Sequence, residues 1–128
     1  MFHLDTILTG LRRESKMKAI ICGGRDFTDR EYLYSVMNQA KNWWSLTTII
    51  HGGAKGADTL GGDWAKYRGL TVIRVPALWD LHGKSAGMIR NKEMLGLQPD
   101  VVIAFKGGAG TENMITISRK AGVPVFIA

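Results

Sequence analysis

Three short apolar runs in this chain each end in a glycine pair and continue into a polar segment with helical character. The pairs are Gly23–Gly24, Gly52–Gly53 and Gly107–Gly108. Apolar, β-branched strands that alternate with helices are typical of a parallel sheet covered by helices on both faces. The repeated unit therefore predicts an α/β fold in which all three glycine turns follow strands that run in the same direction.

The rest of the chain continues this alternation. Right-handed crossovers between the strands would give a single Rossmann-like, doubly wound domain with a mainly parallel five-stranded sheet. A flavodoxin-like strand order remains an alternative. Leu33, Val36, Met37 and Ala40 recur at helical spacing, and Gly69 fits the C-terminus of a helix. Strands are predicted over residues 18–23, 47–52, 70–75, 99–105 and 123–128, and helices over 28–44, 56–69, 84–97 and 110–122.

Length and composition exclude several function classes. The 128 residues fit one domain, and residues 1–16 lack a strand signal, so we expect an N-terminal extension followed by a domain over 17–128. The longest apolar runs are too short to cross a bilayer, and no secretory signal is recognisable. We therefore expect a cytoplasmic protein with no membrane partner. The net charge of +6 favours anionic partners, and Cys22, the single cysteine, fits a reduced core residue.

The three glycine turns fall on the carboxyl edge of such a sheet, where ligands of α/β proteins bind. Glycine lets a ligand approach the backbone closely, and the helix N-termini that follow offer free N–H groups and partial positive charge to a phosphate. Turn geometry alone also explains one glycine pair, but three pairs on one edge favour a phosphate- or nucleotide-binding crevice. The pattern matches neither a dinucleotide fingerprint nor a Walker A loop.

Polar side chains beside the turns complete the predicted site. Arg25 and Lys55 are candidates to pair with phosphate. For Asp58 and Thr111, ligand contact and helix capping are equal alternatives. The predicted ligand-binding residues are Gly23, Gly24, Arg25, Gly52, Gly53, Lys55, Asp58, Arg90, Asn91, Gly107, Gly108, Gly110 and Thr111.

Arg90 and Asn91 fall in the middle of a predicted helix, where they face either the crevice or the solvent. The stretch over residues 77–83 has neither a helix nor a strand pattern, and such loops often carry binding function. Trp79 within it either stacks on a base or is a core or interface aromatic.

Two histidines and a tryptophan pair complete the candidates. His51 directly follows the second strand and fits a buried, hydrogen-bonded imidazole better than a catalyst. His82 has no partner at metal-ligand spacing, so we predict no metal site and no cofactor. Trp43 and Trp44 belong either to the core or to a subunit interface, which leaves a homo-oligomer possible.

The motifs "CGGRDFTD", "HGGAKGAD", "GKSAGMIRN" and "GGAGTENM" together resemble the SLOG superfamily, most closely its small YspA-type members, over nearly all of residues 17–128. The resemblance implies a Rossmann-like fold and a crevice for a nucleotide or a nucleotide-derived ligand, such as a nucleotide sugar or an ADP-ribose-like compound. The superfamily also includes the DprA recombination mediators and the LOG phosphoribohydrolases. Hydrolysis of a nucleotide N-glycosidic bond and binding of single-stranded nucleic acid are therefore the alternatives.

One departure from the LOG pattern bears on hydrolysis. The LOG motif PGGxGTxxE ends in a glutamate that takes part in bond cleavage, but Met114 stands at that position and Lys106 replaces the proline. A thioether cannot act as a general base. If the protein is an enzyme, the candidate catalytic residues are Asp58, Arg90 and Glu112. We expect binding of a nucleotide-like small molecule, with nucleic acid as the less favoured partner.

Overall fold

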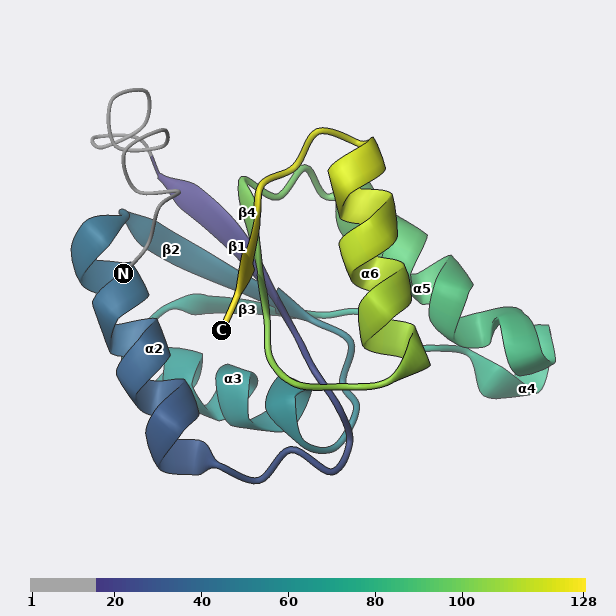
Figure 1. Cartoon of the computed structure of the whole chain (residues 1–128), viewed down its shortest axis with the longest axis horizontal. Helices are drawn as coiled ribbons and strands as arrows, with labels where there is room; N and C mark the ends of the chain where they lie inside the picture. The colour runs from purple at the N-terminus through teal and green to yellow at the C-terminus, as the bar shows by residue number, and fades with distance from the viewer. Residues whose placement is uncertain (1–15) are drawn as a thin grey trace.

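A five-stranded, wholly parallel sheet forms the centre of the protein in the computed structural model, which describes residues 16–128 (Figure 1). Its strands lie in the order β3-β2-β1-β4-β5. This order confirms the predicted Rossmann-like topology and shows that the flavodoxin-like alternative is wrong. The predicted N-terminal extension falls almost entirely outside the described residues and stays a prediction. The strands are β1 (Met17–Cys22), β2 (Leu46–His51), β3 (Thr71–Arg74), β4 (Val101–Ala104) and β5 (Val125–Ile127).

Helices cover both faces of the sheet (Figure 1), with α2 and α3 on one face and α5 and α6 on the other. Successive strand side chains point to opposite faces. Ala19 and Ile21 of β1 accordingly pack in the α2–α3 layer, whereas Ile20 and Cys22 pack in the α5–α6 layer. The strands are apolar throughout because both of their faces are buried. The helices are α2 (Arg30–Trp43), α3 (Ala57–Tyr67), α4 (Trp79–His82), α5 (Ala86–Gly96) and α6 (Ala109–Lys120), with a short 3-10 helix, η1 (Gly83–Ser85).

Local chemistry sets the helix boundaries. The carboxylate of Asp29 accepts a hydrogen bond from the Tyr32 amide at 3.1 Å, so α2 begins directly after Asp29. Gly69 takes a φ of +74°, which lets the chain reverse after α3. The predicted apolar stripe of α2 is buried, and both tryptophans at its end belong to the core or pack against it: Leu33, Val36, Met37, Ala40, Trp43 and Trp44.

The segment between β3 and α5 differs from the predicted irregular loop. It contains α4 and η1, and α5 begins at Ala86 rather than at residue 84. The pattern was missed because a four-residue helix is too short to display helical periodicity. Figure 1 shows α4 at one end of the molecule, and Leu78, Trp79 and Leu81 remain exposed there. Within residues 16–128, no helix is both long and apolar enough to cross a membrane.

Candidate functional site

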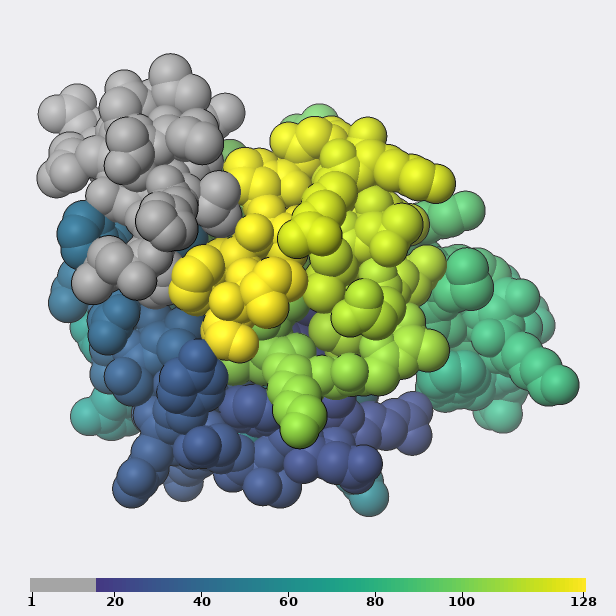
Figure 2. Space-filling model, in the orientation of Figure 1, coloured from purple at the N-terminus to yellow at the C-terminus, as the bar shows by residue number. Residues whose placement is uncertain are grey.

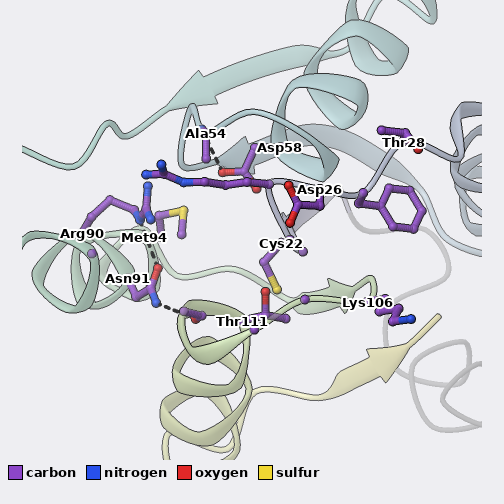
Figure 3. A pocket seen from close by; sticks show the side chains of 18 of the residues that line it. Cys22, Asp26, Thr28, Ala54, Asp58, Arg90, Asn91, Met94, Lys106 and Thr111 are labelled. Atoms are coloured by element: carbon purple, nitrogen blue, oxygen red, sulfur yellow. Dashed lines mark hydrogen bonds between the residues drawn. The ribbon is translucent and has the colours of Figure 1, made fainter.

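The two central strands define where a ligand would enter. The chain leaves β1 through α2 toward β2 and leaves β4 through α6 toward β5, on the opposite side of the sheet. Open α/β sheets bind ligands at such a switch point. A cleft of about 920 Å³ opens there, which is within the size range of ligand pockets. Figure 3 shows Arg90, Asn91 and Met94 of α5, Thr111 of α6 and Cys22 of β1 around this main cleft.

The first and third glycine turns meet at the main cleft. The Gly24 amide donates a hydrogen bond to the Lys106 carbonyl at 2.8 Å. A Cβ added to Gly24 would lie 3.0 Å from the Cα of Gly107. In the space-filling view (Figure 2), the green segment after β4 accordingly lies against the purple-blue segment after β1. Both loops approach backbone to backbone, so the protein's own packing explains why Gly24 and Gly107 are glycines.

Gly108 and Gly110 differ from these packed glycines. Both line the main cleft, yet beyond its chain neighbours and the backbone of α6 itself an added Cβ would meet no protein atom within 4 Å at either position. Neither residue has a positive φ. Gly108 is the N-cap of α6 and Gly110 lies in its first turn, where backbone N–H groups have no intrahelical partner and the helix dipole adds partial positive charge. This end of the cleft therefore combines anion-binding groups with unobstructed access. Because Gly108 is the cap, the capping alternative for Thr111 is wrong.

The amides of the second glycine turn are hydrogen-bonded by the protein itself. The amides of Gly52 and Ala54 donate to Oδ2 of Asp58 at 3.0 and 3.2 Å, and the Gly53 amide donates to Nδ1 of His51 at 3.0 Å. A carboxylate of the chain itself thus occupies the position that the sequence assigned to a phosphate. Gly52 and Gly53 also lie outside the main cleft and line a smaller cavity beside it.

Asp58 holds this second turn in place. It lies in the first turn of α3, where its charge complements the helix dipole as the capping alternative predicted, and its carboxylate accepts hydrogen bonds from the preceding loop. Burial raises the pKa of Asp58, against the opposing effects of the Ala54 amide, the Arg90 charge and the Gly52 amide. Asp58 also lines the main cleft (Figure 3), but its Oδ2 atom already accepts hydrogen bonds from the loop.

Arg90 and Asn91 face the cleft rather than the solvent. Arg90 donates from Nη1 to the Gly52 carbonyl at 2.7 Å and from Nε to Oδ1 of Asn91 at 3.1 Å. Asn91 donates in turn to the Gly110 carbonyl at 3.2 Å and to Oδ1 of Asn113 at 2.9 Å. This chain of hydrogen bonds ties the second turn to α5 and to the N-terminus of α6. A guanidinium has further N–H donors, so Arg90 retains donors for an anion.

Neither Cys22 nor Glu112 is suited to catalysis in the cleft. Burial, followed by the Asp58 charge, raises the pKa of Cys22 to about 12, so the thiol is un-ionised at neutral pH and inert as a nucleophile. Its predicted place in the core is confirmed. Glu112 is exposed and lines neither cavity, so the structure does not bring this predicted catalytic candidate into the cleft. Met114 of α6 is fully buried in the core.

Part of the cleft wall was not predicted from the sequence. Phe27, Thr28 and Asp29 line the cleft together with Asp26, and all four belong to the loop that follows the first glycine turn. Their position directly after a strand at the carboxyl edge was the signal that could have found them. Trp79 also lines the cleft and is 49% exposed, so its interpretation as a core aromatic is wrong. Within residues 16–128, no group of three potential ligands is arranged to hold a metal ion.

His51 is the buried, hydrogen-bonded imidazole that the sequence predicted. Burial lowers its pKa, and the charges of Arg74 and Lys66 lower it further. The unfolded chain binds a proton near pH 6.5 but the folded chain only at lower pH, so the free energy of unfolding is expected to fall as pH drops below 6.5. Urea denaturation between pH 7.5 and 5 measures this slope. His51→Gln is expected to flatten it, and the control His82→Gln to preserve it; equal slopes for all three proteins would refute the assignment.

The parallel sheet and the ligand-sized cleft at its switch point define a Rossmann-like α/β protein. Residues 17–82 match the model of the YspA, cpYpsA-related SLOG family, and the chain belongs to this family. It is similar to the Gene 61 protein of Mycobacterium phage D29, at 34% identity over an alignment of 120 residues that covers 85% of this chain and 94% of the phage protein.

Among solved structures, the chain resembles DNA processing protein A (DprA) from Streptococcus pneumoniae. The TM-score is 0.69 at 21% sequence identity, over 85% of this chain and 49% of that protein. The chain thus spans about half the length of this structural relative. At such identity the similarity concerns the fold.

Proposed function

We propose that this protein binds a nucleotide or a nucleotide-derived ligand in the main cleft, with a phosphoryl group at the N-terminus of α6. One observation carries the proposal. Gly108 and Gly110 line the cleft at a helix N-terminus, and no packing contact or positive φ requires glycine at either position. Close approach of an anionic ligand to the backbone supplies the missing reason.

The other walls of the cleft fit the remaining parts of a nucleotide. Arg90 has donors left for a phosphate or a sugar hydroxyl. Trp79 presents a half-exposed ring, with the Arg25 guanidinium carbon 5.9 Å from its centroid. Rings of this kind stack on bases. Met94 adds apolar surface.

The proposal is one of binding rather than hydrolysis. Of the candidate acids, Glu112 lies outside the cleft and Asp58 is engaged by two amides of the preceding loop. Incubation with the four common nucleoside 5′-monophosphates, followed by chromatography for free base, tests this point. We expect no release of base, and release that Asp58→Asn abolishes would favour the hydrolase instead.

Thermal denaturation with matched ligand pairs tests the binding proposal. Each common nucleoside is compared with its 5′-monophosphate, and at least one monophosphate is expected to stabilise the protein by about 2.7 kcal/mol at a hundredfold excess over its dissociation constant. The nucleosides are expected to stabilise it much less because they lack the anion. Titration with a single-stranded oligonucleotide at several salt concentrations tests the nucleic-acid alternative. An affinity that falls steeply with salt concentration would indicate binding of nucleic acid. The proposal fails if no monophosphate shifts the transition.

A further inference from the structure

A second cavity, here called the side cavity, adjoins the main cleft. Its volume is about 330 Å³. Arg25, Ala54, Trp79 and Arg90 line both the side cavity and the main cleft, so the two spaces share a wall and a ligand in one can extend into the other.

The ionisable lining of the side cavity is entirely cationic. It consists of Arg25, Lys55, Arg74 and Arg90, with no aspartate or glutamate among the lining residues. In the part of the chain that the structure describes, Lys55 and Arg74 form no ion pair and no side-chain hydrogen bond. Arg90 has the nearby charge of Asp58, but Lys55 and Arg74 line the cavity without an acidic partner, and like charges placed in this way repel one another. An anion in the side cavity would remove this repulsion and take up the unused donors.

Arg74 shows how the cavity is built. It ends β3, and its guanidinium folds over the second glycine turn: a Cβ on Gly53 would lie 2.5 Å from Nε and 3.1 Å from Nη2 of Arg74. The amides of this turn are already bound to Asp58 and His51. At the second turn, the groups left for an anion are therefore cationic side chains instead of backbone amides.

We infer that the side cavity is a second anion subsite and that the ligand carries two phosphoryl groups. One group would lie at the N-terminus of α6 and the other among Arg25, Lys55 and Arg74, with Arg90 between them. The inference rests on the proposed function of the main cleft. Nucleoside diphosphates, nucleoside bisphosphates and a short stretch of polynucleotide all share this chemistry.

Calorimetric titration with four probes tests the inference. The probes are the nucleoside 5′-monophosphate that stabilises the protein most, its 5′-diphosphate, its 3′,5′-bisphosphate and a 5′-phosphorylated dinucleotide. At least one doubly phosphorylated probe is expected to bind about 10- to 100-fold more tightly than the monophosphate, as one or two charge-assisted hydrogen bonds would provide. A gain for the diphosphate or bisphosphate identifies a small ligand as the source, and a gain confined to the dinucleotide identifies a polynucleotide; either supports the second subsite.

The Arg74→Gln variant tests whether the gain in affinity for a doubly phosphorylated probe comes from the side cavity. This variant is expected to abolish the gain and to leave the monophosphate dissociation constant within about twofold. Arg119→Gln is the matched control, because it removes the same charge from the C-terminal end of α6, away from both cavities.

Three outcomes would overturn the inference. Equal affinity of the unmodified protein for all four probes would do so while leaving the proposed function intact, and so would a gain that survives Arg74→Gln. Failure of every probe to bind would overturn the proposed function and the second subsite together.

Discussion

Gly110→Ala is expected to weaken nucleotide binding by about 1–3 kcal/mol, the usual effect of forcing an extra methyl group into a close contact, or roughly 5- to 150-fold in dissociation constant. The free energy of unfolding should stay the same or rise by up to about 1 kcal/mol, because alanine is the better helix former. Beyond its chain neighbours and the backbone of α6 itself, no protein atom lies within 4 Å of the added Cβ. Calorimetric titration and urea denaturation of the same sample measure the two effects.

Gly96→Ala supplies the matched control. Gly96 is the last residue of α5 and lines neither cavity, and beyond its chain neighbours and the backbone of α5 an added Cβ has no atom within 4 Å. This variant should show a similar stability change and unaltered binding. The opposite pattern for Gly110→Ala, a loss of stability with full ligand affinity, would mean that glycine at this position serves the fold and would remove the main support for the binding proposal.

The sequence was sufficient to predict the fold because both faces of the sheet are covered. Ile20 and Ile21 point to opposite faces and are both buried, so the strand reads as apolar throughout. Such strands, alternating with helices, leave few topologies once right-handed crossovers are required. The Rossmann-like strand order was predicted with a flavodoxin-like order as the alternative, since β-strand patterns do not record which neighbour each strand pairs with.

The glycine turns of the site were predictable where strand pairing decides their position. The first and third glycine turns follow β1 and β4, and neighbouring parallel strands bring such turns together. The second turn looked the same in sequence, yet its amides bind Asp58 and His51. A carboxylate in the first turn of a helix can cap the helix, bind a ligand or accept hydrogen bonds from the preceding loop. The sequence alone does not distinguish these three roles. Arg74 was missed because, at the end of a strand, it reads as an ordinary edge residue.

Asp58 is expected to matter most for stability. Asp58→Ala removes the acceptor of the Gly52 and Ala54 amides and leaves the half-buried Arg90 without its nearby opposite charge. Breaking one partner of a buried charged network costs about 3–5 kcal/mol, a large share of the roughly 5–15 kcal/mol that stabilises a domain. Urea denaturation at pH 7 measures the loss. Asp63→Ala, on the exposed side of the same helix, should change the free energy of unfolding by no more than about 0.5 kcal/mol.

Asp58→Asn separates hydrogen bonding from charge at the same position. The amide oxygen of asparagine still accepts from the loop, so the loss at pH 7 should be well below that of Asp58→Ala. Burial raises the pKa of Asp58 above 3.8, so the folded state binds this proton more tightly than the unfolded state does. The stability that results is present below pH 3.8 and is lost as the pH rises through the pKa of the folded state. Asparagine does not titrate, so Asp58→Asn has no such loss. Its free energy of unfolding should therefore fall below that of the unmodified protein by less at pH 7 than at pH 3.5. If Asp58→Ala and Asp58→Asn were equally destabilised at pH 7, the hydrogen bonds to the second turn would not be what makes Asp58 important.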